Sequence, residues 1–256
     1  MTTPSLLIKQ MAGICQLTLN KPEIHNAFDD KLIEALVLAL EQAKHDPQVE
    51  IVVLRANGKN FSAGADLNWM QRMASFSHEE NVQDAQQLAH LLQTLDELPK
   101  PTLALVQGAA LGGAIGLIAC CDIAIATQDT YFCFSEVKLG LVPAVISPYV
   151  IRAIGERQAR YYFLTAERFN AKKAQQLGLI HQIIDKLPLT DAGSVVCQQL
   201  QNLCPKALAQ AKQLLQNVSG KPIDQTLVNY TCQALAEARL RSTTQVKLQN
   251  FLNHRS

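Results

Sequence analysis

Residues Gln107–Asp122 read Q-G-A-A-L-G-G-A-I-G-L-I-A-C-C-D, and this stretch decides how the chain folds. It follows the apolar run Thr102–Val106, whose length and side chains are typical of a buried strand. Gly112 and Gly113 allow a sharp turn, and the small apolar residues that follow predict a buried helix. A strand, a glycine turn and a helix N-terminus in this order would direct free N–H groups at one point, which suits an oxyanion.

The same stretch permits a second interpretation as a membrane span. Leu103–Cys121 is 19 residues long with Gln107 as its only polar residue, which is long enough to cross a bilayer. Four glycines within it, and the alternating Ile-Ala-Ile that follows Asp122, favour the interior of a globular domain instead. The sequence therefore predicts a buried core segment and no membrane association.

Bulk composition indicates one large globular domain or a main domain with an appendage. The chain has 256 residues, of which 48% are apolar and 18% charged, so it can bury a sizeable core. A net charge of +1 gives no bulk attraction to nucleic acid or anionic lipid, and no nucleic-acid partner is expected. Seven cysteines without a C-x-x-C pair indicate reduced thiols, and no secretory signal is apparent. A cytoplasmic location is expected.

Hydrophobic patterning predicts an α/β core followed by helices alone. Strands are expected at 5–10, 14–20, 50–56, 102–106, 122–126, 131–134 and 179–184, with helices at 31–44, 68–76, 79–95, 113–121, 147–154, 156–164 and 171–178. From Leu189 onward every apolar pattern is helical, with breaks at Pro205 and at 219–222. The predicted domains are residues 1–188 and residues 189–256.

Motifs for common chemistries are absent from the chain. It contains no G-x-G-x-x-G, G-x-x-x-x-G-K-[ST], G-x-S-x-G or H-E-x-x-H sequence, and its histidines lack the spacing of metal ligands, so no metal site is predicted. Two glycine-bearing loops remain, at 57–67 and 107–113, together with Glu136 in the apolar setting Phe134-Ser135-Glu136-Val137. Taken alone, Glu136 fits either a functional carboxylate or an ordinary surface one.

Five motifs in this order and spacing resemble the crotonase, or enoyl-CoA hydratase/isomerase, superfamily over residues 5–185. They are F-S-A-G-A-D-L (61–67), Q-G-A-A-L-G-G-A (107–114), C-D-I-A-I-A (121–126), S-E-V-K-L-G-L-V-P (135–143) and L-T-A-E-R-F-N-A-K-K-A-Q-Q-L-G-L-I (164–180). Within the superfamily, residues 65–70 and 135–150 are similar to the methylglutaconyl-CoA hydratase branch.

The resemblance implies a spiral of ββα turns, a helical C-terminal subdomain that assembles homotrimers or dimers of trimers, and an acyl-CoA thioester as substrate. It assigns two backbone N–H donors for the thioester oxygen to Ala65 and Gly113. Coenzyme A is part of the substrate, and no other cofactor is implied. The residues that it places against coenzyme A or the acyl group are Lys59, Ala63, Ala65, Asp66, Leu67, Asn68, Gly113 and Ala144.

The chain also departs from the pattern of the superfamily. Many of its hydratases use two glutamates; one corresponds to Glu136, but the other corresponds to Gly116, which has no side chain. The turn after Pro143 is bulkier than usual, although it still offers the Ala144 N–H. The last helix lacks the usual lysine and reads F-L-N-H at 251–254.

These features together predict a hydratase for a conjugated enoyl-CoA with a second carboxylate, such as 3-methylglutaconyl-CoA. Glu136 would handle the water or the α-proton, and Ala65 and Gly113 would stabilise the enolate. Arg72 is a candidate for the distal carboxylate, although a solvent-facing arginine fits it equally well. Two alternatives are an enoyl-CoA isomerase with Glu136 as its single carboxylate and a non-catalytic scaffold that binds coenzyme A or RNA.

Overall fold

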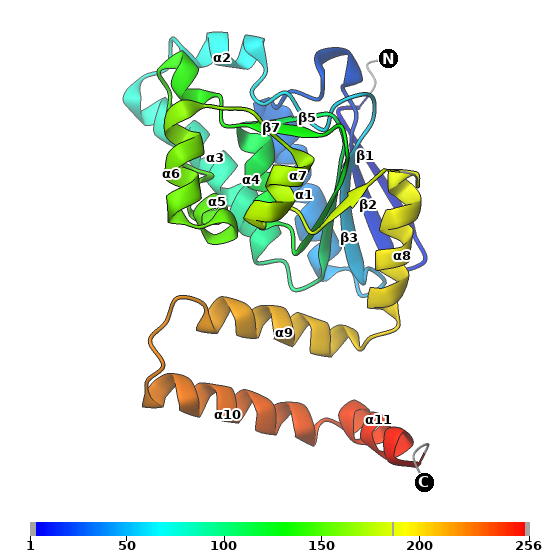
Figure 1. Ribbon diagram of the computed structural model, residues 1–256. Helices are drawn as coiled ribbons and strands as arrows, with labels where there is room; N and C mark the ends of the chain where they lie inside the picture. Colours follow the sequence, from blue (N-terminus) through cyan, green and yellow to red (C-terminus); the bar gives the residue numbers. More distant parts are fainter. Residues whose placement is uncertain (1–3, 186, 254–256) are drawn as a thin grey trace. The chain divides into compact units, whose positions relative to one another are not determined.

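The computed structural model describes residues 4–185 and 187–253, which divide into two units, Met1–Asn202 and Leu203–Ser256 (Figure 1). The first unit contains a six-stranded sheet with the order β1-β2-β3-β4-β6-β9. β1 pairs antiparallel with β2, and all other neighbours in this sheet are parallel. The strands are β1 Leu6–Met11, β2 Ile14–Leu19, β3 Ile51–Ala56, β4 Thr102–Val106, β6 Ile123–Thr127 and β9 Gln182–Ile184.

Both faces of this sheet are covered, which explains why its central strands are continuous apolar runs. Val52 and Leu54 of β3 face the larger core, which the helices α1 (Asp30–His45), α3 (His78–Asp96) and α4 (Gly113–Cys120) cover (Figure 1). Their neighbours Ile51 and Val53 face a smaller cluster, covered by α8 (Leu189–Gln201). Successive residues of a strand point to opposite faces, so each strand supplies both cores.

A second, three-stranded sheet has the order β5-β7-β8. Its strands are β5 Ala109–Leu111, β7 Tyr131–Cys133 and β8 Phe169–Asn170. Two isolated parallel bridges, Phe28 with Ala65 and Ser62 with Ala110, continue the pairing into the earlier turns. The turns that leave β2, β3, β4 and β6 each run from the large sheet to this second layer and then into helix, which is the predicted spiral of ββα turns.

The central stretch forms β4, β5 and α4, so the prediction of a buried core segment is confirmed. Residues 4–185 and 187–253 contain no helix that is long and apolar enough to cross a bilayer. The short strand β5 was not predicted, because three residues between glycines carry no periodic signal. Residues 136–139, for which neither a strand nor a helix was predicted, form a 3-10 helix, η2 (Glu136–Leu139). The cytoplasmic location stays a prediction.

The remaining elements of the first unit follow the patterning closely. Asp29 caps the N-terminus of α1, because its carboxylate accepts from the Leu32 N–H at 2.7 Å, and α3 begins with a capping box of Ser77 and Glu80. Gly178 ends α7 in the left-handed conformation. The other helices are η1 Pro22–Ile24, α2 Leu67–Met73, α5 Ser147–Ile154, α6 Glu156–Thr165 and α7 Ala171–Leu177.

The boundary between the units differs from the one predicted between residues 188 and 189. α8 belongs to the first unit, because Ala192 and Cys197 are buried in the smaller core beneath β4 and β6. Gly193 makes this approach possible, since a Cβ on it would lie 2.8 Å from Leu105 Cδ1. The second unit consists of α9 Pro205–Val218, α10 Gln225–Leu240 and α11 Ser242–Asn253. Its predicted role in trimer formation stays a prediction.

Candidate active site

The backbone N–H of Ala65 is left free by the way its loop is held. Phe28 forms a parallel bridge to this loop: its N–H donates to the Gly64 carbonyl at 2.7 Å, and its carbonyl accepts from the Asp66 N–H at 2.7 Å. Ala65 lies between these two bonded residues, and in an extended segment it must therefore direct its own N–H away from Phe28. Across the part of the chain that the structure describes, no acceptor is recorded for the Ala65 N–H.

The Gly113 N–H is free for a different reason, because Gly113 is the first residue of α4. The first N–H groups of a helix have no partner within the helix. Gly112 precedes it with a φ of 52°, and its N–H donates to the Cys133 carbonyl at 3.0 Å, which ties the helix start to β7. Within residues 4–185 and 187–253, no acceptor is recorded for the Gly113 N–H either.

The register of the second layer brings these two donors to the same edge. Ser62 pairs with Ala110 in parallel, so three residues further along each segment the chain reaches Ala65 and Gly113. Phe28 supports both positions, because its backbone flanks Ala65 and its Cδ2 lies 3.9 Å from where a Cβ on Gly113 would be. Two adjacent free N–H groups are the arrangement that stabilises an oxyanion.

Asn26 anchors the loop that carries Ala65. Its side chain is buried, accepts from the Lys21 N–H at 2.8 Å, and donates to the carbonyls of Asn57 (2.8 Å) and Asn60 (2.9 Å). The Asn60 side chain in turn accepts from the Ala109 N–H at 2.9 Å, which joins the loop to β5. The loop is therefore fixed on both sides before any ligand binds, and the donor position is preorganised.

We expect Asn26→Ala to lower the free energy of unfolding by about 3 kcal/mol. It leaves buried backbone groups unpaired and places an alanine at a φ of 54°, which asparagine tolerates better. Urea unfolding would measure the change. Asn26→Gly is the matched control, because glycine relieves the backbone strain but still lacks the side-chain bonds; a loss in Asn26→Ala below about 1 kcal/mol would contradict this account of the loop.

Glu136 lies directly against the start of α4. It follows β7 at the beginning of η2, and a Cβ on Gly112 would lie 3.0 Å from Glu136 Oε1. Its other oxygen, Oε2, is buried and has no hydrogen-bond partner among the described residues. Burial raises the pKa of the Glu136 carboxyl, and a hydrogen bond from its own backbone N–H opposes this shift only in part. A partly buried carboxyl with an unpaired oxygen at the start of α4 has the chemistry to move a proton on a ligand bound there.

Among the described residues, neither the Ala144 amide nor the Ser135 hydroxyl is bonded to Glu136. The Ala144 N–H donates to the Val142 carbonyl at 2.8 Å, and no bond from Ser135 to Glu136 is recorded in the described part of the chain. The role of Ala144 in substrate binding stays a prediction.

The predicted coenzyme A segment is exposed around Ala65. Lys59, Leu67 and Asn68 are exposed, and Leu67 is 80% accessible despite being apolar. Asp66 caps α2, because its Oδ1 accepts from the N–H groups of Asn68 (2.9 Å) and Trp69 (3.0 Å). The Ala63 N–H donates to the His25 carbonyl at 3.0 Å. Asp66 and Ala63 thus shape the segment, while Lys59 and Leu67 are available to a ligand.

Arg72, the candidate for a distal carboxylate, is already paired. Its Nη2 lies 2.7 Å from Asp30 Oδ1, which joins α2 to α1. Trp69 joins α2 to α3, because its Nε1 donates to Asp84 Oδ1 at 3.0 Å. Both contacts fix the position of α2, and the Arg72 guanidinium faces a protein carboxylate of its own.

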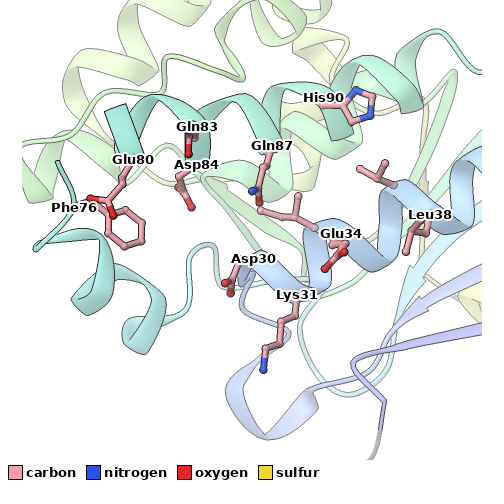
Figure 2. Close-up of a pocket in the computed structure, with 12 residues that line it drawn as sticks. Asp30, Lys31, Glu34, Leu38, Phe76, Glu80, Gln83, Asp84, Gln87 and His90 are labelled. Atoms are coloured by element: carbon pink, nitrogen blue, oxygen red, sulfur yellow. The ribbon is translucent and has the colours of Figure 1, made fainter. Parts of the chain in front are cut away.

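A cavity of about 520 Å³ lies between α1 and α3 and is separate from the predicted site (Figure 2). Asp30 and Glu34 on α1 face Gln83, Asp84 and Gln87 on α3 across it. Burial raises the pKa of Asp84, and the nearby Asp30 carboxylate acts in the same direction. No residue that the sequence assigned to coenzyme A, the thioester or the proton lines this cavity.

The sequence did not indicate two residues that support the Ala65 loop. Asn26 and Phe28 lie just before α1, in a short segment whose apolar residues show no periodic spacing. Only Asn26 carried a sequence signal, because an asparagine shortly after Lys21-Pro22 is typical of a turn.

Comparison with known proteins gives one consistent result. A model of the family described as enoyl-CoA hydratase/isomerase matches residues 9–255. The crystal structure of an enoyl-CoA hydratase from Shewanella pealeana has a TM-score of 0.95 and 47% identity, covering 98% of this chain and 94% of that one. The enoyl-CoA isomerase/hydratase fer4 of Mycosarcoma maydis is 35% identical over 213 residues, which cover 79% of this chain and 77% of that protein.

A third relative is named for a different reaction. The trans-2-decenoyl-[acyl-carrier-protein] isomerase of Streptococcus mutans is 35% identical over 178 residues, which cover 68% of this chain and 66% of that protein. The match of the family model over nearly the whole length, the spiral of ββα turns and the two relatives above agree with one another. The chain belongs to the enoyl-CoA hydratase/isomerase family.

Proposed function

We propose that this protein adds water to the conjugated double bond of an enoyl-CoA, with coenzyme A carried in as part of the substrate and no further cofactor. The observation that carries the proposal is the partly buried Glu136 carboxyl against Gly112, with its buried Oε2 unpaired among the described residues, at the start of the helix whose first residue is Gly113. Hydration of an enoyl thioester needs a proton carrier and a place for negative charge on the thioester oxygen, and these are the two parts present.

In the proposed reaction the thioester oxygen accepts hydrogen bonds from Ala65 and Gly113. This withdraws electrons from the double bond, and the start of α4 adds the positive end of its dipole. Ionised Glu136 takes a proton from water as the water oxygen bonds to the β-carbon. The π electrons move toward the thioester as an enolate, and Glu136 then gives the same proton to the α-carbon. The sum is one water added, with Glu136 returned to its starting state.

A single carboxylate can complete this cycle because it acts first as base and then as acid. The raised pKa of Glu136 helps, since a less acidic carboxyl accepts a proton from water more readily. The rate is expected to fall as the pH drops through this pKa, because the protonated form cannot accept a proton from water. The acidic limb of the pH–rate profile should therefore lie above the usual range of glutamate.

For the acyl group we propose a dicarboxylic chain, with 3-methylglutaconyl-CoA as the first substrate to test. The support is the similarity of residues 65–70 and 135–150 to the corresponding branch of the family. A distal carboxylate would have to draw Arg72 away from Asp30, since these two residues are 2.7 Å apart. The pair is half exposed, so its rearrangement carries only a modest cost.

Isomerisation of an enoyl-CoA is the second candidate function. It requires Glu136 to move a proton between the α- and γ-carbons, without water and without a second acid. The observation that favours it is that Gly116 offers no side chain for a second carboxylate. The Streptococcus mutans relative, which is named as an isomerase, supports keeping this candidate.

A panel of enoyl-CoAs would separate the two reactions. Straight, branched and dicarboxylic conjugated substrates, together with their non-conjugated isomers, would be incubated with the protein and analysed by chromatography and mass spectrometry. The proposal expects hydroxyacyl-CoA from conjugated substrates, fastest for a dicarboxylic one. Double-bond migration without hydration would replace it with the isomerase. Binding of coenzyme A or RNA with no turnover of any thioester would contradict both.

We also propose that the protein is a homotrimer or a dimer of trimers. α9 and α10 bury none of their described side chains, although they carry large apolar residues. Leu215, Ile223, Leu235 and Leu240 are 66%, 89%, 52% and 81% exposed. Apolar surface on this scale is typical of an interface between subunits. Analytical ultracentrifugation at micromolar concentration is expected to give a multiple of three chains, and a single 28.1 kDa species would contradict it.

A further inference from the structure

Gly116 stands in the middle of α4, where glycine is unfavourable unless something requires it. Its φ is not in the left-handed region, so the backbone conformation does not require glycine. The requirement comes from a neighbour instead. A Cβ on Gly116 would overlap Ile146 Cγ2, and would lie 3.0 Å from Ile146 Cβ and 3.4 Å from Leu92 Cδ2. The side chain of Ile146 occupies the space that a side chain on residue 116 would take.

Ile146 ends the segment that begins with Glu136. The segment leaves β7, forms η2, and reaches Ile146 immediately before α5. Both of its ends contact the same helix: Glu136 lies against Gly112, and Ile146 against Gly116. Gly112 is the residue that precedes α4, and Gly116 lies about one helical turn further along the chain. Ile146, which is only 2% exposed, therefore packs against α4 about one turn beyond the place where Glu136 meets its N-terminus.

We infer that Ile146 is a positioning residue for Glu136. Its side chain fills the space beside Gly116 and so keeps a second polar side chain, and water, away from the carboxylate. This inference rests on the proposed function and deepens it: the reaction is run by one carboxylate, whose Oε2 is buried. An acid restored at position 116 would have no room unless Ile146 were also reduced in size.

The electrostatics around Glu136 agree with this role. The pKa of Glu136 is raised by burial, and no charged side chain of the described residues adds to the shift. α4 carries no Asp, Glu, Lys, Arg or His, and on α5 Arg152 pairs with Asp96 and lies over Tyr149. Lys138 of η2 is exposed, with Nζ 3.9 Å from Cys133 Sγ. Exclusion of water is thus the main control on this carboxyl, and Ile146 supplies part of that exclusion.

The first test compares Ile146→Ala with Ile154→Ala, which removes the same atoms from the core at the other end of α5. The readouts are the pH profile of kcat/KM and a ¹³C NMR titration of Glu136, which needs no turnover. Ile146→Ala is expected to lower kcat/KM about tenfold and to move the Glu136 titration down by about one pH unit, because water then reaches the carboxylate. Ile154→Ala should leave the titration in place, and Ile146→Val should restore most of the shift.

The second test measures the coupling between Ile146 and Gly116. Gly116→Ala is expected to lower kcat/KM by about tenfold or more, because its Cβ displaces Ile146. In the Ile146→Ala background the same change should cost less than about threefold, since the nearest atom is then the Cβ of residue 146. Equal losses in the two backgrounds, or an unchanged Glu136 titration in Ile146→Ala, would overturn the inference. A wild type that turns over no enoyl-CoA would refute the proposed function, whereas turnover with an unchanged Glu136 titration in Ile146→Ala would refute this inference alone.

Discussion

Glu136→Gln is expected to lower kcat by about a thousandfold or more while KM changes little. The amide keeps the size and shape of the side chain against Gly112 but can neither take a proton from water nor give one to the α-carbon. A group that acts mainly in the transition state affects kcat more than binding. Steady-state kinetics with the best substrate of the panel would measure the loss. Glu156→Gln, an exposed glutamate at the start of α6, is the matched control.

The same substitution should not weaken the fold. The pKa of Glu136 is raised in the folded protein, so the folded state holds this proton more tightly than the unfolded chain does. The contribution of protonated Glu136 to the free energy of unfolding is therefore lost as the pH rises from the usual pKa range of glutamate through the raised pKa. Above this pH range Glu136→Gln removes a partly buried charge, and the melting temperature of the variant at about pH 8 is expected to equal or exceed that of the wild type.

Near-wild-type hydration by Glu136→Gln would show that another group carries the proton.

Gly113→Pro is expected to lower kcat by about a hundredfold to a thousandfold, with a much smaller effect on the affinity for coenzyme A. Proline suits the first position of a helix, and the N–H that it removes has no acceptor among the described residues of the protein. The fold therefore loses no bond of its own, while the thioester oxygen loses one of two donors.

Gly113→Ala is the matched control for this position because it keeps the N–H. A Cβ there would lie 3.9 Å from Phe28 Cδ2, which is an ordinary contact, so the protein itself has room for it. The alanine variant should retain much more activity than the proline variant. Equal losses in turnover and in coenzyme A affinity for Gly113→Pro would mean that the turn is only structural.

Most elements of the fold could be predicted from the sequence because their signals are local. Buried parallel strands such as β3 and β4 are continuous apolar runs, and Asp29 marks the start of α1. The short strand β5 could not be predicted, since its pairing partners lie in other turns of the spiral. The position of α8 was also missed, because an apolar stripe does not reveal which sheet face it will cover.

The candidate site was predictable only in part. The glycines at 112 and 113 indicated an N–H cluster by themselves, whereas Glu136 gained its role from the resemblance to the family. Gly116 was visible as a missing side chain, but a sequence cannot tell that Ile146, thirty residues later, fills the space. The Ala144 amide was expected to be free and instead donates to Val142. The space beside Gly116 is decided by a contact between segments that are distant in the sequence, which a single sequence does not reveal.

The central claim is that Glu136 carries the proton that reaches the α-carbon. Hydration of a conjugated enoyl-CoA in D₂O, followed by mass spectrometry of the product, tests it most directly, because a proton delivered by Glu136 must first have come from solvent water. The wild type is expected to give a product with deuterium fixed at the α-carbon, and Glu136→Gln is expected to give none above the rate without enzyme. Deuterium incorporation by Glu136→Gln at the wild-type rate would contradict the account.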